Sequence, residues 1–342
     1  MGKYLLNIAG LVLISTVLQA QSLTVVTLNV WSGLNYIGYL KMGEYETPGH
    51  REARYQALLA SLKALNPDIV GLNEANKVPR YAERIARDLG MDEIHHLGLG
   101  GVRAGPLGLP VNLREGDVIL ANPALRLKWE GRLQLSGGPV GKFFTFHTTD
   151  ATQVVAGSVQ VGGQTVYLFV THWHASPFLT PENLTLWRAD SVQGKITPER
   201  YAANKREAGE GQRWREGESA KMLAYIDKIA GDAPVILMGD FNAMRGMPEI
   251  ERYIQAGFVD VYGELNDNPG YTWDDVFNSN IIEYQLPEND ATKIRRRHRI
   301  DFIFARGNWE LIESKVVFDK PFNGVMPSDH FGVLGRLKLR PK

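Results

Sequence analysis

The sequence contains no cysteine among its 342 residues, and this absence excludes several kinds of chemistry. Disulfide bonds, thiolate nucleophiles, iron–sulfur clusters and cysteine-ligated zinc cannot be present. Any bound metal must therefore be held by Asp, Glu, Asn or His side chains. Ligand sets of this oxygen-rich kind favour Mg²⁺, Mn²⁺ or Ca²⁺.

The chain also has no net charge, because 38 Lys and Arg residues balance 38 Asp and Glu residues. A neutral protein has no overall field that draws it onto polyanions, which argues against a non-specific nucleic-acid binder. Residues 293–299 (Lys-Ile-Arg-Arg-Arg-His-Arg) are the only dense basic run. This run is either a solvated loop or a local patch that contacts phosphate.

Long apolar runs are missing from the sequence except at the N-terminus. Residues 1–20 begin with a single Lys, continue mostly apolar and end in Ala20 before polar residues. This pattern predicts a secretory signal peptide cleaved near Ala20, so that residues 21–342 are exported to the periplasm or the medium. An N-terminal membrane anchor is the alternative, but the run is short for a full span and contains Asn7.

Short apolar runs that stop abruptly at polar residues are the main feature present. Residues 235–238 are all apolar and run directly into Gly239-Asp240-Phe241-Asn242. Such a run after a proline predicts a buried strand, and Asp and Asn favour the turn that follows it. In layered α/β proteins, ligands bind at the carboxyl ends of such strands. We therefore expect a site at this turn, with Asp240 and Asn242 on the same side if the backbone stays extended.

The same pattern recurs along the chain. Other β-like runs also end in, or carry, polar residues that are costly in a strand. The out-of-character residues are Asn29, Glu74, His172, Asp240, Asn242, Asp301, Asp329 and His330. Any one of them alone is more often a surface or turn residue. Their recurrence at strand ends predicts one shared site.

Helical periodicity between these strands predicts crossover units and a layered α/β fold. The predicted helices cover residues 51–65, 80–90, 213–229 and 247–256, and β-like runs cover residues 117–121, 125–135, 143–149, 151–161 and 165–171. Gly and Pro predict a loop over residues 97–116 and a polar insertion over residues 176–212. No internal repeat or low-complexity linker is visible, so we expect a single domain after the signal peptide.

Three of these residues could bind a divalent cation. Asn29, Glu74 and Asp329 offer hard oxygen ligands. Mg²⁺ keeps several waters and needs only one or two protein carboxylates. His172 and His174, two residues apart, could also chelate a metal if both lay on one face of a strand. The alternative is that only one of them points into the site.

The remaining residues suit hydrolysis by water. His330 could act as a general base if Asp301 orients its other ring nitrogen. Asp240 could accept a hydrogen bond from the attacking water. Asn242 and His172 could stabilise negative charge on a pentacovalent phosphorus. This is metal-assisted hydrolysis without a covalent nucleophile.

Taken in order, these motifs resemble the endonuclease/exonuclease/phosphatase superfamily. The matching segments are Thr27-Leu28-Asn29-Val30-Trp31, Leu72-Asn73-Glu74, Thr171-His172, Gly239-Asp240-Phe241-Asn242, Arg299-Ile300-Asp301-Phe302-Ile303-Phe304 and Ser328-Asp329-His330. The resemblance implies a four-layered α/β/β/α sandwich with two packed mixed β-sheets, Mg²⁺ (or Mn²⁺) as cofactor, and the roles given above. One departure is Asn73, where Gln is usual, which puts the supporting contact of that side chain in doubt.

The resemblance leaves the substrate open, because the fold hosts several phosphoesterases. Asn29-Val30-Trp31, His172-Trp173-His174-Ala175 and the insertion before residue 213 resemble the neutral sphingomyelinase branch. A secreted, sphingomyelinase-like phospholipid phosphodiesterase is therefore the first hypothesis. Trp31 and the loop residues Tyr36, Tyr39 and Tyr45 could then touch a membrane surface, unless they are ordinary packing aromatics.

Three other functions remain as alternatives. A secreted endonuclease or exonuclease could contact backbone phosphates through Arg295, Arg296, Arg297 and Arg299. A small-molecule phosphatase comes next. A non-catalytic binding module is the weakest alternative, because every expected catalytic residue is present. No obligate protein partner is inferred.

Overall fold

The computed structural model describes residues 22–35, 43–100, 103–104, 107–108, 112–137, 152–285 and 296–341. The predicted signal peptide and the predicted strand at residues 143–149 lie outside these ranges.

Two six-stranded mixed sheets form the centre of the fold. The first contains, in spatial order, β15 (Trp309–Val317), β16 (Gly332–Leu339), β1 (Ser22–Asn29), β2 (Ile69–Asn76), β6 (Arg114–Ala121) and β3 (Asp92–Gly100). The second contains β11 (Val259–Asp260), β14 (Asp301–Arg306), β10 (Val235–Asp240), β9 (Gln164–His172), β8 (Thr152–Val161) and β7 (Lys128–Ser136). Two short pairs complete the strands: β4 (Arg103–Ala104) with β5 (Leu107–Gly108), and β12 (Trp273–Asp274) with β13 (Arg297–His298).

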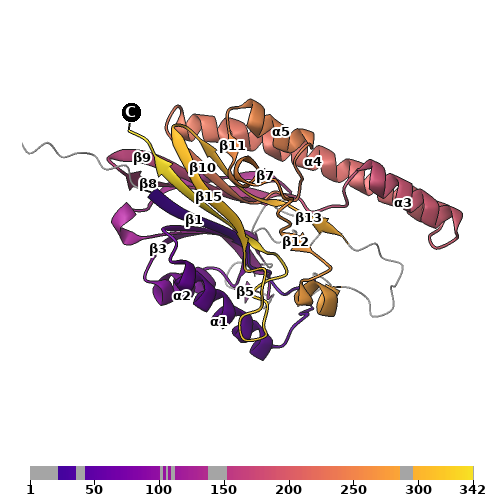
Figure 1. The fold of residues 1–342 in the computed structure, drawn as a ribbon. Coiled ribbons are helices and arrows are strands. Elements are labelled where there is room, and N and C mark those ends of the chain that lie inside the picture. The colour runs from indigo at the N-terminus through magenta and orange to yellow at the C-terminus, as the bar shows by residue number, and fades with distance from the viewer. Residues whose placement is uncertain are drawn as a thin grey trace, which may run out of the picture.

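Helices cover the outer face of each sheet (Figure 1). Helices α1 (Pro48–Leu65) and α2 (Arg80–Leu89) pack on the first sheet, and α4 (Pro198–Ala230) and α5 (Pro248–Gln255) pack on the second. The others are α3 (Pro181–Val192), α6 (Val261–Leu265), the 3₁₀-helix η1 (Pro123–Leu125) and the π-helix η2 (Ile281–Gln285). The predicted four-layered sandwich is confirmed.

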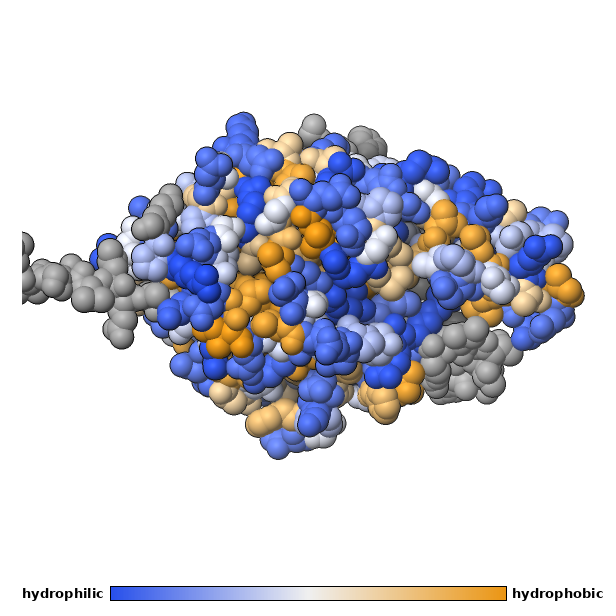
Figure 2. All heavy atoms as spheres, turned by 45° about the horizontal axis from the view of Figure 1, so that its top comes forward, coloured by the Kyte–Doolittle hydropathy of each residue, from blue (hydrophilic) through white to orange (hydrophobic). Residues whose placement is uncertain are grey.

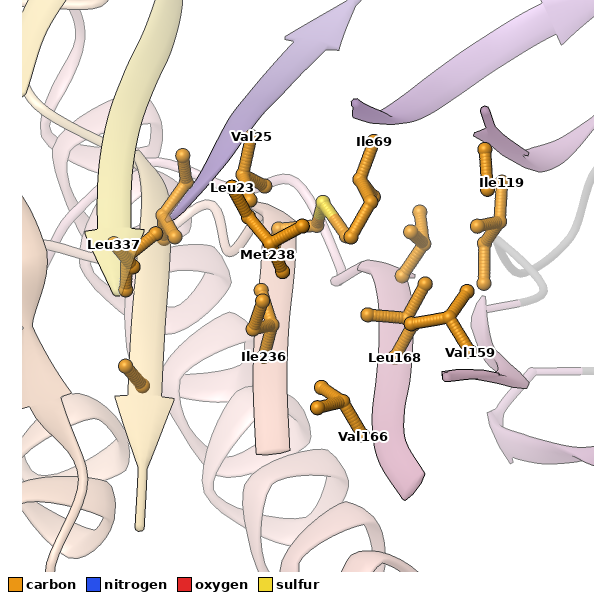
Figure 3. Close-up of a cluster of buried hydrophobic side chains, with 14 of the residues drawn as sticks. Leu23, Val25, Ile69, Ile119, Val159, Val166, Leu168, Ile236, Met238 and Leu337 are labelled. Carbon is orange, nitrogen blue, oxygen red and sulfur yellow. The ribbon is translucent and has the colours of Figure 1, made fainter. Parts of the chain in front are cut away.

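The two sheets meet across a layer of aliphatic side chains. Figure 3 shows Leu23, Val25 and Ile69 of the first sheet facing Leu168, Ile236 and Met238 of the second. Every one of these six side chains has an exposed fraction of 0%. Gly71 lets the sheets approach closely, since a Cβ there would lie 2.7 Å from Met238 Sδ and 2.9 Å from Val170 Cγ2.

The polar insertion at residues 176–212 is helical, which corrects the sequence prediction. Pro181 and Pro198 are the first residues of α3 and α4, and Thr180 and Thr197 cap these helices through their side chains. Proline is tolerated at the first helical position because its missing N–H would have no partner there. The insertion prolines therefore begin helices. Helix α1 starts in the same way, three residues before the predicted Arg51.

Part of the predicted loop at residues 97–116 is also sheet. Strand β3 extends to Gly100, and β6 begins at Arg114, pairing with it in antiparallel register. The glycines there led to a loop prediction. Gly116 instead allows close strand contact, because a Cβ would lie 2.2 Å from the His96 carbonyl oxygen.

Candidate active site

Parallel strand pairs bring the predicted site residues to one edge of the sandwich. In the first sheet β1 runs parallel to β2, with Asn29 opposite Asn73. In the second sheet β9 runs parallel to β10, with His172 opposite Asp240, and Asp240 also faces Asp301 of β14. Parallel strands end at the same edge, so these polar ends gather there. The polar strand ends of both sheets thus contribute to one cluster.

Asn29 joins the two sheets through its amide nitrogen. This nitrogen donates to Glu74 Oε1 at 2.8 Å and to Asp240 Oδ2 at 3.1 Å, and the amide oxygen accepts from the Trp31 backbone N–H. Glu74 also accepts from the Ser32 N–H at 3.1 Å. In this arrangement the nitrogen of Asn29 faces the carboxylates, so a metal-ligand role for its oxygen would require the amide to turn over.

Gly239 allows β10 to approach β9 closely next to Asp240. Gly239 has φ +142°, and a Cβ there would lie 2.0 Å from the Thr171 carbonyl oxygen. Only glycine fits such a close backbone approach. Asp240 is 1% exposed, and its Oδ2 lies 3.6 Å from His172 Nε2. A buried carboxylate is thus held at the centre of the cluster.

Asn73 connects the first sheet to the end of β10 in the second sheet through hydrogen bonds. Its Oδ1 accepts from the Asp240 backbone N–H at 3.1 Å. Its Nδ2 donates to the Thr171 carbonyl at 2.9 Å and to Asp117 Oδ1 at 2.7 Å. The shorter side chain of Asn73 therefore reaches the second sheet and supports the backbone of Asp240.

Three site residues adopt a left-handed backbone. Trp31, Glu74 and Asn242 have φ of 57°, 53° and 45°. Such conformations are costly for residues other than glycine and often occur at functional sites. The condition under which Asp240 and Asn242 would share one side, an extended backbone, is therefore not met at Asn242, whereas the predicted turn is present. Asp240 Oδ1 instead accepts from the Asn242 N–H at 2.9 Å, which closes a tight turn.

His330 and Asp301 form a buried pair. His330 Nδ1 lies 2.9 Å from Asp301 Oδ2, and the Asp301 N–H donates to Thr272 Oγ1 at 3.1 Å. Burial disfavours the charged imidazole, but the negative carboxylates of Asp301 and Asp240 outweigh it and hold the pKa of His330 well above its usual value. The predicted partnership of these two residues is present in the geometry.

His172 faces the carboxylates and His174 does not. Burial opposes the charged form of His172, but the carboxylates of Asp240 and Glu74 raise its pKa to about 9. His174 instead packs against Trp214, with ring centroids 5.9 Å apart. The chelating pair is therefore not formed, because β9 ends at His172 and the alternation of a strand stops there.

Asp329 lies on the loop before β16, and two polar neighbours hold it. Gln285 Nε2 donates to its Oδ2 at 2.6 Å, and Ser328 Oγ donates to its Oδ1 at 3.2 Å. Burial and the negative charge of Glu74 raise the pKa of Asp329 to about 6. Two acids that repel each other in this way suit a divalent cation, which would neutralise both.

A second group of side chains in the described residues could also hold a cation. One ligand atom each of Asp240, Asp301 and His330 lie within 4.8 Å of one another. Asp301 Oδ1 is buried without a hydrogen-bond partner. However, Nδ1 of His330 already pairs with Asp301, which suits a base better than a metal ligand. The donor set of Glu74 and Asp329 is the better fit for Mg²⁺, which prefers oxygen.

Two supporting residues were missed by the sequence analysis. Asp117 accepts hydrogen bonds from Asn73 and from Gln153 Nε2, the latter at 2.9 Å, and burial raises its pKa to about 6. Arg54 donates to the carbonyls of Trp31 and Pro327. The sequence carried a signal for Asp117, because an Asp within a predicted strand is unusual. It carried no signal for Arg54, because an arginine in a helix is ordinary.

The cluster opens into a cavity of about 540 Å³ between the ends of the two sheets. Glu74, His172, Asp240, Asn242 and His330 line one part of it. Such a cavity, with converging polar groups and shifted pKa values, is typical of an active site.

A sequence profile of the Endonuclease/Exonuclease/phosphatase family matches residues 26–330. The chain belongs to this family. Its members are phosphoric ester hydrolases. All eight predicted site residues lie within the matched range, and His330 is its last position. A comparison with curated proteins finds no match.

Several solved structures resemble the chain. An endonuclease/exonuclease/phosphatase family protein from Bacteroides thetaiotaomicron is 17% identical, with a TM-score of 0.62 over 94% of this chain and 100% of that chain. TDP2 from D. rerio, complexed with single strand DNA product, is 18% identical, with a TM-score of 0.58 over 92% and 98%. A functionally unknown conserved protein from Enterococcus faecalis is 16% identical, with a TM-score of 0.57 over 93% and 100%. At these identities the likeness shows a shared fold.

Proposed function

We propose that the protein is a divalent-metal-dependent phosphodiester hydrolase that acts by direct attack of water on phosphorus. The observation that carries the proposal is the separation of 3.8 Å between His330 Nε2 and Asp240 Oδ2. These atoms are too far apart for a direct hydrogen bond, and a water between them could bond to both. Asp301 holds the opposite nitrogen of His330, which orients Nε2 to accept the proton of that water.

His172 and Asn242 are the groups that would stabilise negative charge on the phosphoryl oxygens. Both line the same cavity as Asp240. With a pKa of about 9, His172 carries a proton at neutral pH and can donate from Nε2. Asn242 donates one N–H to the Trp173 carbonyl at 3.0 Å, which leaves its second N–H for the substrate.

Glu74 and Asp329 would hold the cation, with Asn29 as a third ligand if its amide turns over. Mg²⁺ is the expected ion and Mn²⁺ the alternative, because the donors are hard oxygens. When bound, the ion would polarise a phosphoryl oxygen as a Lewis acid. The support for this assignment is that burial, together with the negative charge of Glu74, raises the pKa of Asp329.

Removing and restoring the metal tests this function. The protein would be treated with a chelator, dialysed, and assayed on bis(p-nitrophenyl) phosphate with Mg²⁺, Mn²⁺, Ca²⁺ or no metal. We expect hydrolysis only with added metal, and most with Mg²⁺ or Mn²⁺. Full activity in excess chelator would contradict the proposal.

Two substrate classes are supported by specific observations. The Asn29-Val30-Trp31 and His172-Trp173-His174-Ala175 segments support a sphingomyelinase-like phospholipid phosphodiesterase. Trp31 itself is 5% exposed and packs against Tyr45, which is 37% exposed. Tyr36 and Tyr39 lie outside the described residues. Nucleic acid is the second class, supported by Arg296, which lines the cavity.

Two further arginines of the basic run are described, and they do not favour nucleic acid, whereas Lys293 and Arg295 lie outside the described residues. Arg299 makes two hydrogen bonds to Asp260, at 2.8 and 2.7 Å, and Arg297 binds Asp274 at 2.8 Å. These arginines are already neutralised within the protein. A Mg²⁺-dependent panel of sphingomyelin vesicles, plasmid DNA, RNA and small phosphate esters would identify the class. Phosphocholine release with intact nucleic acids would favour the lipid, and nicked plasmid would favour the nuclease.

We also propose that the protein is exported after cleavage near Ala20. The support is the sequence pattern of residues 1–20. Among the described residues, no helix combines the length and apolarity needed to cross a membrane. On the face drawn in Figure 2, hydrophobic residues lie in patches separated by hydrophilic ones. Mass spectrometry of the N-terminus of protein recovered outside the cytoplasm would test the cleavage, and an intact Met1 would contradict it.

A further inference from the structure

A single peptide group joins helix α4 to the side chain of Asn242. The carbonyl of Trp173 accepts from Asn242 Nδ2 at 3.0 Å, and the N–H of His174 donates to Glu218 Oε2 at 3.0 Å. This carbonyl and this N–H belong to the same peptide bond, which is planar, and in the trans form they point in opposite directions. Glu218 and Asn242 therefore bind the two sides of one rigid group.

Glu218 is an unusual residue for the buried side of a helix. It is 1% exposed on α4, which packs against the outer face of the second sheet (Figure 1). Three neutral donors surround its carboxylate: the His174 N–H, the Thr152 hydroxyl at 2.7 Å and the Ser136 hydroxyl. Burial of a carboxylate is costly unless such donors compensate it. In return, hydrogen bonds to an ionised acceptor are stronger than bonds between neutral groups.

The same face of α4 also holds the chain beyond His174. Gly211, Arg215 and Glu218 follow one another at steps of four and three residues, so they lie on one side of the helix. Arg215 Nη1 donates to Ser176 Oγ at 2.6 Å. Gly211 leaves room for this serine, because a Cβ there would lie 1.8 Å from Ser176 Oγ. Helix α4 thus fixes the backbone that follows β9 at two points.

The orientation of the Asn242 amide depends on the Trp173 carbonyl. The two N–H groups of Asn242 share one planar nitrogen, so the direction of the bond to Trp173 sets the direction of the second N–H. In the proposed function, that second N–H faces a phosphoryl oxygen. A carbonyl becomes a better acceptor when the N–H of its own peptide group donates to a charge, because linked hydrogen bonds polarise one another.

We propose that Glu218 is a positioning residue that orients the amide of Asn242 through the Trp173–His174 peptide group. The inference rests on the proposed function, in which Asn242 stabilises negative charge on the phosphoryl oxygens. In the described part of the chain, Glu218 is not among the side chains that line the active-site cavity. It acts on the reaction only through this peptide group and does not touch the substrate.

A double-mutant cycle tests this role with bis(p-nitrophenyl) phosphate in saturating Mg²⁺. The four proteins are the natural protein, Glu218→Gln, Asn242→Ala and the double variant. Glu218→Gln should lower kcat of the natural protein about 10- to 100-fold, the effect of losing a hydrogen bond to a charged group. In the Asn242→Ala background the same change should lower kcat less than about twofold, because the amide that Glu218 orients is absent. An equal fold change in both backgrounds would overturn the proposal.

Two controls separate positioning from a general loss of structure. The calorimetric Mg²⁺ affinity of Glu218→Gln should match that of the natural protein, because Glu74 and Asp329 make no bond to this peptide group. Ser136→Ala is the matched control, since it removes a donor to the other oxygen of Glu218, and its kcat should stay near the natural value. A drop in Ser136→Ala as large as that in Glu218→Gln would contradict the role of the His174 bond. Glu218→Asp, which keeps the charge but is one methylene shorter, replaces Glu218→Gln in the cycle if that variant does not fold.

The natural protein in the same assay distinguishes failure of this inference from failure of the proposed function. Absence of metal-dependent hydrolysis by the natural protein would overturn the proposed function and, with it, this inference. Metal-dependent hydrolysis with equal fold changes in the two backgrounds would overturn only the positioning role of Glu218. A large effect of Glu218→Gln that disappears in Asn242→Ala is the result that we expect.

Discussion

Asp240 is the residue at which the two sheets and the proposed chemistry meet. Its Oδ2 accepts from Asn29 of the first sheet and lies 3.6 Å from His172 and 3.8 Å from His330. The sequence predicted that Asp240 ends a buried strand. It could not predict the left-handed turn at Asn242, because that conformation is stabilised by contacts with distant segments.

The pairing of His330 with Asp301 predicts a shift in the pH dependence of hydrolysis. Only neutral His330 can accept a proton, so the rate should rise as pH passes its pKa, which Asp301 holds high. Asp301→Asn removes this negative charge and lowers the pKa of His330. The rise in kcat/KM should then begin at lower pH, with a reduced maximum. An unshifted pH profile in Asp301→Asn would show that Asp301 does not determine the pKa of the general base.

Asp117 should make the unfolding free energy depend on pH. Its pKa is about 6 in the folded protein against 3.8 ordinarily, so the folded state binds more protons between these values. Stability therefore decreases as pH rises from about 4 to about 6. The side chain in Asp117→Asn cannot ionise. Over this pH interval the unfolding free energy of the natural protein should therefore fall by up to about 3 kcal/mol relative to that of the variant.

Urea unfolding at several pH values, with chelator present, would measure this difference. A constant offset between the two proteins at all pH values would mean that Asp117 titrates normally.

At the scale of elements, helix α1 connects two loops that lie next to proposed metal ligands. Arg54 of α1 is 4% exposed and donates to the carbonyls of Val30, Trp31 and Pro327, at 3.0, 3.2 and 2.9 Å. Glu46 Oε2 accepts from its Nε at 2.7 Å and compensates its charge. These loops adjoin Asn29 and Asp329, so one guanidinium fixes both sides of the proposed metal site.

Arg54→Lys should weaken metal binding because a single ammonium cannot bridge three carbonyls and a carboxylate. Loss of a partner that orients metal ligands typically costs about 10- to 100-fold in affinity. Titration calorimetry with Mn²⁺ would measure this. The matched control is Arg84→Gln, which removes an exposed ion pair with Glu52 on the neighbouring helix. Equal metal affinity in Arg54→Lys and the natural protein would contradict the role.

The sequence predicted the strands better than the long insertion. The apolar run at residues 235–238 was found within β10, and the runs predicted at residues 151–161 and 165–171 were found as β8 and β9. The N-terminal half of α4 has few apolar residues, so its periodicity is weak. Its helix signal was the cap Thr197 followed by Pro198, which resembles a break when proline is considered alone.

At the scale of the whole molecule, the site exists only because two sheets pack face to face. Glu74 and Asp329 belong to the first sheet and its loops, whereas His172, Asp240 and Asp301 belong to the second. The sequence predicted which residues would gather. It could not predict how near they would lie, because Asn73, Gly71 and Gly239 set that distance through contacts between the sheets.

A site shared between sheets predicts that metal binding stabilises the fold. An ion that binds only the folded protein raises the melting temperature as its concentration rises above Kd. Mg²⁺ should therefore raise Tm of the natural protein in thermal unfolding experiments. Glu74→Gln should remove this dependence, while Glu52→Gln, on the exposed surface of α1, should retain it. The same Mg²⁺-dependent rise in Glu74→Gln would place the ion elsewhere.

The most direct measurement is the turnover of bis(p-nitrophenyl) phosphate by His330→Ala in saturating Mg²⁺. Loss of a general base predicts a decrease in kcat of about 10²- to 10⁴-fold. Circular dichroism and calorimetric Mg²⁺ affinity should match those of the natural protein, which would show that the fold and the metal site are intact. Near-normal kcat in His330→Ala would contradict the assignment of the buried His330–Asp301 pair as the group that activates water.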